Sequence, residues 1–480
     1  MKKVLSILLS LTLVVGLLVG MPAIDTKADG TITVTAPVNG AQVDLLSGNI
    51  LEFSKNYQLG RAKELYKRRS DTYFPAPVAF SWNAVSGANE YFISIATNSN
   101  MTGAISYGTA TNSIEVEDLN PGQKYYYKVT CKASGGNFGS GIKSFTTTDL
   151  PKTISVDKVG NTRDIGGRYV NGGKQKVRYG RVIRGANVND ISDEGRAKLL
   201  NVYGIKMDFD LRDKSKESVP DVSPLGSNTK FVNIKGVEYN SSEKGIGNPN
   251  NYDRARSEIL LFADPSNFPI YVHCQIGRDR TGTICFLIES LLGMDDLDMF
   301  RDYELSYFSN AANNDLADPD ATTNGAFARM VNYLRNYSDG NLQQNTEKYM
   351  KQELGITDAQ IQAIKDNMLT PLPKPTPKPT PAPTVKTPGK VSIKSAKNSK
   401  KKIVVVKYKK ATNAKGYQVW WATSKKFKKA KKKFTSKTTY KIKKLKKKKK
   451  YYIKVRAYNL NGNTKVYGAF SKVKKVKIKK

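Results

Sequence analysis

The stretch "FPIYVHCQIGRDRTGTICFLIESLLGM", from Phe268 to Met294, contains a short apolar strand, a turn and a helix in succession. The residues before Cys274 form a continuous apolar run, which is typical of a strand in a parallel sheet. From Thr281 the apolar residues follow helical spacing up to Gly293, a residue type that often ends a helix. The stretch therefore predicts a strand that turns directly into a helix.

The same alternation continues upstream. In "NDISDEGRAKLLNVYGIKMDFDLRD", residues 189–213, Ser192 is a suitable N-cap, the leucines have helical spacing, and Gly204 can close the helix before the strand "IKMDFDL". "RARSEILLFAD" is a further helical segment. Strands that alternate with helices predict parallel strands with crossover helices, and so a central α/β domain with a mostly parallel sheet.

The turn after Cys274 has the chemistry of an anion site. The carboxyl end of a strand is where an open α/β sheet presents its ligands, and a helix N-terminus offers free N–H groups to an anion. Such termini and nearby cations favour the thiolate form of a cysteine. Gly277 lets the backbone come close, and the planar guanidinium of Arg280 can hold two oxygens of a tetrahedral dianion. A thiolate beside a phosphate cradle predicts attack on phosphorus, with a phosphocysteine intermediate and neither metal nor cofactor.

This turn resembles the signature loop of cysteine-based phosphatases, which is His-Cys, five residues, Arg, then Ser or Thr. "GRDRTG" is similar to the Gly-Lys-Asp-Arg-Thr loop of the atypical bacterial tyrosine and dual-specificity phosphatases, with Arg278 where lysine is commoner. "NTRDIGG", residues 161–167, resembles the segment that opens the catalytic domain of that family. The resemblance covers residues 156–355 and implies a phosphoric monoester hydrolase.

The resemblance also implies roles for individual residues. Cys274 is the expected nucleophile, Arg280 stabilises the transferring oxygens, and Thr281 assists departure of the thiolate. The expected phosphate-binding residues are Gln275, Ile276, Gly277, Arg278 and Arg280. Arg278 either adds positive charge at the mouth of the site or is a plain solvated side chain.

The general acid has two candidate positions, because the leaving oxygen needs a proton from a carboxylic acid within hydrogen-bond reach. Related phosphatases with an aspartate just before the loop arginine imply Asp279. Ordinary tyrosine phosphatases use an aspartate on a separate loop, so Asp210 or Asp213 is the alternative.

Other uses of this cysteine fit less well. His273 is the only histidine, and neighbouring strand residues point to opposite faces, which argues against a Cys–His protease and for a structural role. Three dispersed cysteines and one histidine offer no usual zinc site, and Cys285 is expected to be buried and inert. Rhodanese-like sulfur transfer would require neither "NTRDIGG" nor Asp279.

The regions on either side of the α/β segment repeat one another. "GANEYFISIATNSN" (87–100) aligns with "NAKGYQVWWATSKK" (413–426) at a shift of 326 residues, and the same shift places Tyr125 on Tyr451. Both copies contain strands with a period of two and a leucine six residues before a tyrosine, as in the tyrosine corner of a β-sandwich. They resemble fibronectin type III modules. The first copy also has a charged, helix-like insertion, "SKNYQLGRAKELYKRRSD", residues 54–71.

Charge and the chain ends complete the organisation. Residues 390–480 contain 35 of the 79 Lys+Arg and none of the 41 Asp+Glu. Lys2 and Lys3 followed by an apolar run predict a secretory signal peptide, and alternating prolines after residue 370 predict an extended spacer. The expected parts are a signal peptide (1–28), a fibronectin type III-like domain with insertion (31–150), a cysteine phosphatase domain (151–369), a Pro/Thr/Lys-rich linker (370–389) and a Lys-rich fibronectin type III-like domain (390–480).

The sequence thus predicts a secreted or cell-surface phosphatase acting on phosphotyrosine, other phosphoproteins or a phosphoinositide. The alternative is a surface adhesion protein whose central domain binds phosphorylated ligands without turnover. The basic domain is expected to bind anionic cell-wall polymers or a membrane surface, and no nucleic acid partner is expected.

Overall fold

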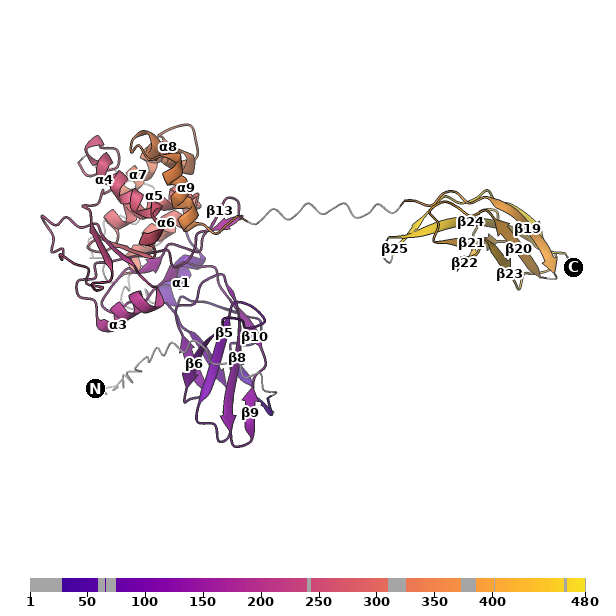
Figure 1. Ribbon diagram of the computed structural model, residues 1–480, viewed down its shortest axis with the longest axis horizontal. Helices are drawn as coiled ribbons and strands as arrows, with labels where there is room; N and C mark the ends of the chain where they lie inside the picture. Colours follow the sequence, from indigo (N-terminus) through magenta and orange to yellow (C-terminus); the bar gives the residue numbers. More distant parts are fainter. Residues whose placement is uncertain are drawn as a thin grey trace. The chain divides into compact units, whose positions relative to one another are not determined.

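A computed structural model describes residues 28–58, 65, 75–239, 243–309, 325–372, 386–400, 402–461 and 464–479. The chain forms two compact units, one up to residue 373 and one from residue 374 (Figure 1). The expected signal peptide and most of the expected linker lie outside the described residues, as does most of the insertion after residue 58. Within the described part, no helix is both long and apolar enough to cross a bilayer.

The first unit begins with a sandwich of two β-sheets. One sheet has the order β1-β9-β8-β10-β3, with β5 joining β8 to β6, and the other has the order β2-β4-β7. The strands are β1 (Gly30–Thr31), β2 (Val34–Ala36), β3 (Ala41–Val43), β4 (Val78–Trp82), β5 (Tyr91–Ala96), β6 (Ile105–Thr109), β7 (Ser113–Val116), β8 (Lys124–Ala133), β9 (Gly136–Gly139) and β10 (Lys143–Thr147). The period-two pattern of β8 puts Tyr125, Tyr127 and Val129 into the core.

The second unit is also a sandwich. Its sheets have the orders β19-β20-β23 and β22-β21-β24-β25, and β26 also pairs with β24. The strands are β19 (Ile393–Lys400), β20 (Ile403–Tyr408), β21 (Gly416–Ala422), β22 (Lys431–Thr435), β23 (Thr439–Ile442), β24 (Lys450–Asn461), β25 (Thr464–Tyr467) and β26 (Lys474–Lys477).

The tyrosine corner expected from the repeat is present in both sandwiches. The Tyr125 hydroxyl accepts a hydrogen bond from the Asn120 N–H at 2.8 Å. At the shifted position, the Tyr451 hydroxyl accepts from the Lys446 N–H at 3.1 Å. Two all-β sandwiches therefore flank the α/β part of the chain, as predicted.

The α/β part of the first unit, called the central domain below, contains a six-stranded sheet of order β11-β12-β15-β18-β16-β17. Strands β15, β18, β16 and β17 are parallel, and β11 and β12 run antiparallel at one edge. The strands are β11 (Lys152–Thr153), β12 (Arg163–Asp164), β15 (Val182–Gly185), β16 (Met207–Asp210), β17 (Lys230–Asn233) and β18 (Ile270–His273), and a separate pair is formed by β13 (Tyr169–Val170) and β14 (Gln175–Lys176).

The helices of the central domain begin and end largely where the sequence patterns predict. Ser192 caps its helix by accepting a hydrogen bond from the Gly195 N–H, and Gly293 ends α5 with a φ of 80°. The helices are α3 (Asp193–Ala197), which continues as the π-helical turn η1 (Lys198–Val202), α4 (Tyr252–Leu260), α5 (Asp279–Leu292), α6 (Asp296–Leu305), α7 (Ala326–Arg335), α8 (Leu342–Gln352) and α9 (Asp358–Met368). Short 3-10 turns are η2 (Pro249–Asn251), η3 (Leu261–Ala263), η4 (Pro265–Asn267) and η5 (Ser306–Phe308).

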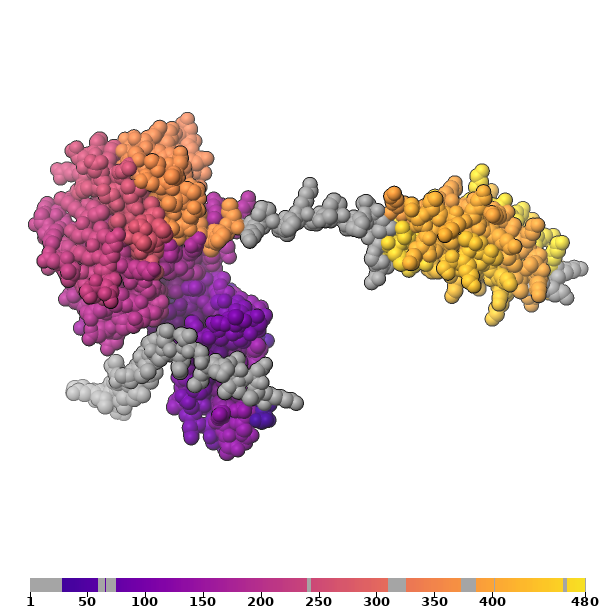
Figure 2. Space-filling view, in the orientation of Figure 1, coloured from indigo at the N-terminus to yellow at the C-terminus, as the bar shows by residue number. Residues whose placement is uncertain are grey.

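The first sandwich also contributes the helix α1 (Gly48–Lys55), which lies mostly before the predicted helical insertion. Ile50 and Phe53 of α1 pack into a buried apolar cluster with Leu305, Tyr307 and Phe308 of the central domain. The ring centroids of Phe53 and Phe308 are 5.0 Å apart. Within the first unit the sandwich and the central domain thus share a core, and their surfaces run together in the space-filling view (Figure 2).

Candidate active site

The turn singled out in the sequence connects the carboxyl end of β18 to the first residue of α5. Cys274 follows His273, the last residue of β18, and is only 1% exposed. Gly277 has a φ of 71°, and a Cβ on it would lie 2.1 Å from the Gly185 carbonyl oxygen. The loop is therefore pressed against the end of β15, and only glycine fits at position 277.

Side chains from outside the loop hold three successive loop carbonyls. The carbonyl of Gln275 accepts a hydrogen bond from the Asn187 amide nitrogen Nδ2 at 3.0 Å. The carbonyl of Ile276 accepts from Asn161 Nδ2, and that of Gly277 from Arg184 Nη2, each at 2.9 Å. A trans peptide directs its N–H opposite to its carbonyl. The N–H groups of residues 276–278 are thus directed to the other side of the loop, as an anion cradle requires.

A buried ion-pair network supports this arrangement. Asp302 of α6 accepts a hydrogen bond from Arg163 Nε at 2.6 Å and pairs with Arg184 as well. Burial alone would raise the pKa of Asp302, but the two arginines hold it below the ordinary aspartate value. Asn161 and Arg163 belong to the "NTRDIGG" segment, and this segment therefore fixes the shape of the loop.

Arg280, in the first turn of α5, is held by a carboxylate that the sequence reasoning missed. Both terminal nitrogens of its guanidinium pair with Glu217, and Nη2 lies 3.0 Å from Oε1. Burial alone would lower the pKa of Arg280, but Glu217 and the nearby Cys274 keep it above its usual value. The guanidinium is therefore fixed, charged and close to the cysteine. Glu217 lies in an irregular loop with no distinctive pattern, so no local signal could have identified it.

Thr281 is buried in α5 directly after Arg280. Among the described residues its hydroxyl has no hydrogen-bond partner. A buried hydroxyl without a partner is costly unless another group uses it. The hydroxyl makes no hydrogen bond to Cys274, so the role of Thr281 toward the thiolate stays a prediction.

The three candidate acids have different surroundings. Asp279 is 34% exposed and accepts a hydrogen bond from the Tyr239 hydroxyl at 2.6 Å. Asp210 is fully buried and pairs with Arg212 at 2.7 Å. Asp213 accepts from the Ser215 hydroxyl at 2.6 Å and pairs with Lys235 at 2.9 Å, and these contacts lower its pKa. A carboxyl group whose pKa is lowered, as that of Asp213 is, is a poor proton donor, and Asp210 is buried in its pair with Arg212. The partly exposed position of Asp279 beside Arg280 therefore favours Asp279 as the acid.

The surroundings of Arg278 exclude one of the two descriptions that the sequence suggested. Its side chain is 12% exposed, so it is not a plain solvated arginine. Its Nη2 donates to the hydroxyls of Tyr303 and Tyr307 at 2.8 and 3.3 Å, and the guanidinium lies over both rings. These tyrosines are 25 and 29 residues away, so the loop sequence could not reveal them. Tyr307 is also a member of the cluster that contains α1, which links the first sandwich to the loop.

The remaining histidine and cysteine have structural surroundings. His273 Nε2 lies 2.8 Å from Asp208 Oδ1, and the two buried side chains bridge β18 and β16. Burial alone would lower the pKa of His273, but Asp208 and Asp210 raise it. Cys285 is fully buried in α5, and burial raises the pKa of its thiol to about 12.

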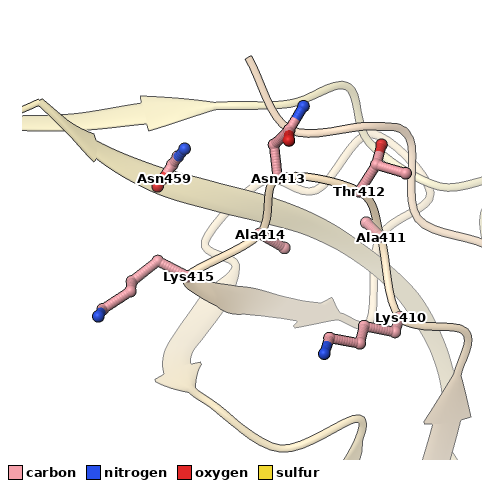
Figure 3. A pocket seen from close by; sticks show the side chains of 7 residues that line it. All are labelled: Lys410, Ala411, Thr412, Asn413, Ala414, Lys415 and Asn459. Atoms are coloured by element: carbon pink, nitrogen blue, oxygen red, sulfur yellow. The ribbon is translucent and has the colours of Figure 1, made fainter. Parts of the chain in front are cut away.

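Two further features of the described residues help to delimit the site. No group of three or more His, Cys, Asp or Glu side chains in this part of the chain is arranged to hold a metal ion. An open hollow in the second unit is lined by Lys410, Ala411, Thr412, Asn413, Ala414, Lys415 and Asn459 (Figure 3). It contains no acid, histidine or cysteine, so the residues suited to catalysis are those around Cys274.

Comparison with known proteins agrees with this chemistry. Residues 154–370 match the model of the tyrosine phosphatase family. Among solved structures, the chain is similar to the core catalytic domain of the PP-IP phosphatase Siw14 from S. cerevisiae in complex with citrate, at 16% identity over 40% of this chain and 95% of that chain (TM-score 0.25). It is also similar to the chicken CNTN1 FN1-FN3 domains, at 13% identity over 84% of this chain and 95% of that chain (TM-score 0.21). No match was found among curated proteins.

The structural similarities are too weak to carry an argument, whereas the family match covers the central domain with the Cys274 loop inside it. The chain is a multidomain phosphatase whose residues 154–370 match the tyrosine phosphatase family.

Proposed function

We propose that the chain hydrolyses phosphate monoesters through a phosphocysteine intermediate on Cys274, without a metal ion. The single observation that carries this proposal is the fixed loop. Its carbonyls at residues 275–277 are held outward, with a cysteine at one end and a charged arginine at the other. Such a loop binds a tetrahedral dianion through N–H groups and a guanidinium, which leaves the cysteine as the attacking group.

In the first step, the Cys274 sulfur attacks phosphorus while the bond to the ester oxygen breaks. Asp279 gives its proton to the departing oxygen, and Arg280 with the loop N–H groups holds the other phosphate oxygens. In the second step, water attacks the phosphocysteine and Asp279 takes up the proton of that water. The sulfur leaves as a thiolate that the Thr281 hydroxyl stabilises, and inorganic phosphate is released.

Phosphotyrosine and other phosphoprotein groups are the proposed substrates, and a phosphoinositide is a further candidate. All are phosphate monoesters, and the loop contacts described above distinguish only the phosphate group. Export by the signal peptide at residues 1–28 would place the enzyme outside the cell or on its surface, and the two lysines followed by an apolar run there support this.

The first experiment measures release of inorganic phosphate by the purified full chain, with EDTA present, from an aryl phosphate and from a phosphoinositide. Wild type is expected to turn over, and Cys274→Ser is expected to be inactive. Asp279→Asn is expected to lose about 10²- to 10⁴-fold in rate, which is the usual contribution of a general acid, whereas Asp213→Asn should keep most of the activity.

One result would contradict the proposed enzymatic activity and favour the alternative, a protein that binds phosphorylated ligands without turnover. If wild type binds vanadate or a phosphopeptide but releases no phosphate from either substrate, the central domain is a binding module for phosphorylated ligands. Activity that persists in Cys274→Ser would instead remove the cysteine mechanism.

The Lys-rich second sandwich is proposed to retain the enzyme on anionic cell-wall polymers or a membrane surface. Its 35 basic residues are not balanced by any acid within residues 390–480. Because exposed charges are screened by salt, retention on acidic cell-wall material should fall steeply as ionic strength rises. Retention that is indifferent to salt, or to deletion of residues 389–480, would contradict this.

A further inference from the structure

One face of the second sandwich combines aromatic rings with two cations that are only partly exposed. It lies on the sheet formed by β22, β21, β24 and β25, and we call it the cation–aromatic face. Its residues are Trp420, Phe427, Lys454, Arg456, Tyr467 and Phe470, all of which are intermediate in exposure.

The rings hold the two cations in place. Lys454 Nζ lies 4.3 Å from the ring centroid of Phe427 and 4.0 Å from that of Phe470. The Arg456 guanidinium lies 3.7 Å from the ring centroid of Tyr467, and its Nε donates to Gln418 Oε1 at 2.8 Å. Both cations are thus fixed by neutral groups. Burial and the neighbouring Arg456 also lower the pKa of Lys454.

The first sandwich provides an internal reference for this face. Across β22, β21 and β24 one row of facing residues is Lys432, Trp420 and Lys454. The row at the same register in the first sandwich, shifted by 326 residues, is Ser106, Ser94 and Lys128. In the next row, Phe434, Gln418 and Arg456 replace Gly108, Phe92 and Thr130. The lysine at position 454 thus has a counterpart in the first sandwich, Lys128, whereas Trp420 and Arg456 replace Ser94 and Thr130 and are particular to the second sandwich.

The charge of the face lacks an internal partner. Residues 390–480 contain no Asp or Glu, so a carboxylate of the same domain cannot neutralise Lys454 or Arg456. Two adjacent cations that are already ordered lose little further side-chain entropy when they bind an anion. Charge complementarity therefore points to a polyanion.

The ring contacts narrow the chemical class of that polyanion. Proteins that bind single-stranded nucleic acid stack bases on open aromatic faces. Here Lys454 and Arg456 already lie over the rings of Phe427, Tyr467 and Phe470. A ligand that offers anionic oxygens and hydroxyls, but no flat bases, matches such a surface better.

We propose that the cation–aromatic face binds the anionic groups of a glycan, a sugar polymer whose units carry phosphate or carboxylate. The inference rests on the proposed retention of the second sandwich on anionic polymers, and it assigns that role to a particular face. It does not depend on the chemistry of the central domain.

The test uses the full chain and immobilised polygalacturonate, a polymer of sugar acids, with a neutral glucan as the blank. Lys454→Gln/Arg456→Gln removes the two ordered cations. Lys407→Gln/Lys441→Gln removes the same charge from exposed positions on β20 and β23 of the other sheet and is the matched control. The face variant should bind about tenfold more weakly or worse, because it loses the two ordered cations that would make charge-assisted hydrogen bonds to the polymer. The control should lose less than about twofold.

A second variant tests the rings. Trp420→Ser introduces the residue found at this register in the first sandwich, and it should weaken binding while the net charge is unchanged. Thermal unfolding of each variant distinguishes a lost site from a lost fold, and only variants that fold as wild type does are compared.

Equal losses in the two double variants would overturn the proposal, because net charge alone would then explain binding. Tighter binding of single-stranded DNA or of phosphatidylglycerol vesicles, lost in the same face variant, would overturn the glycan as the occupant. Phosphate release is measured on the same samples. An inactive enzyme that still binds polygalacturonate through this face would contradict the proposed phosphatase mechanism and leave this inference intact.

Discussion

The two sandwiches share a skeleton but differ in what their surfaces contact. In each, a core tyrosine accepts a backbone hydrogen bond at the corner, and a second one, Tyr91 or Tyr417, accepts from the N–H six residues before it. The first sandwich packs α1 against the central domain, whereas the second belongs to a separate unit and contains no acid. A few inward residues thus fix the fold, and the outer residues are free to take on different tasks.

The largest expected difference is between two deletions, each of which removes one sandwich. Deleting residues 28–150 would expose Leu305, Tyr307 and Phe308, each worth about 1.5–3 kcal/mol of burial. The midpoint of thermal unfolding of the central domain should therefore fall by about 10 °C or more, and phosphate release should fall with it. Deleting residues 389–480 should leave both quantities nearly unchanged, as calorimetry and the phosphatase assay can show.

The reverse outcome would remove the distinction between the sandwiches. If the chain without residues 28–150 keeps its unfolding midpoint and its activity, the first sandwich is as independent of the central domain as the second unit.

A single substitution in α1 should test the contact between the first sandwich and the central domain. Phe53→Ala removes a fully buried ring from the cluster shared with the central domain and should cost about 3–5 kcal/mol. Because Tyr307 of that cluster also contacts Arg278, the affinity for vanadate should fall as well. Phe145→Ala makes a similar cavity in the core of the first sandwich, outside this cluster, and is the control. Equal vanadate affinities in the two variants would rule out a path from α1 to the loop.

The pH dependence of stability should also separate the two units. Glu258 of the central domain is fully buried, its Oε2 has no hydrogen-bond partner among the described residues, and burial raises its pKa to about 8. The folded state then keeps a proton that the unfolded chain releases above pH ~4.3, so stability falls as pH rises from there to about 8. His273, whose pKa is also raised, acts in the same direction.

Calorimetry at pH 5.5 and 8.5 would measure this effect. The unfolding midpoint of the first unit should be lower at the higher pH, and Glu258→Gln should reduce the difference. The second unit lacks acids and histidine, so its midpoint should stay nearly constant. A pH difference that is the same in wild type and Glu258→Gln would show that Glu258 is not the source.

The smallest expected effects concern the shared skeleton. Tyr125→Phe and Tyr451→Phe each remove one hydroxyl that accepts a backbone hydrogen bond, at a cost of about 1 kcal/mol. Each substitution should lower the unfolding midpoint of its own unit by a few degrees. A shift in one unit only would mean that the two corners are not equivalent, despite the register of 326 residues.

Sequence reasoning succeeded where a local pattern determines the structure. The strand before Cys274, the cap at Ser192 and the end of α5 at Gly293 each depend on residues within one turn or one strand. The two sandwiches could be predicted because alternation and the repeated tyrosines are also local. Family resemblance assigned "NTRDIGG" to the catalytic domain but did not predict its place under the loop, because its partner Asp302 lies far along the chain.

The rest depended on contacts that no local pattern records. Arg278 is only partly exposed because Tyr303 and Tyr307 from a later helix and turn contact it. Glu217 reaches Arg280 from an irregular loop, and α1 begins before the charged segment that was expected to be helical. In each case the deciding partner is set by tertiary packing.

The burial of two thiols gives the chain a practical property. Burial raises the pKa of Cys131 in the first sandwich and that of Cys285 in α5, so both resist alkylation at neutral pH. Cys274 is the one cysteine placed at a helix N-terminus beside a charged arginine. A chain with three cysteines should therefore take up a single equivalent of iodoacetamide. Its labelled mass would report, molecule by molecule, how much of a preparation has its active site intact.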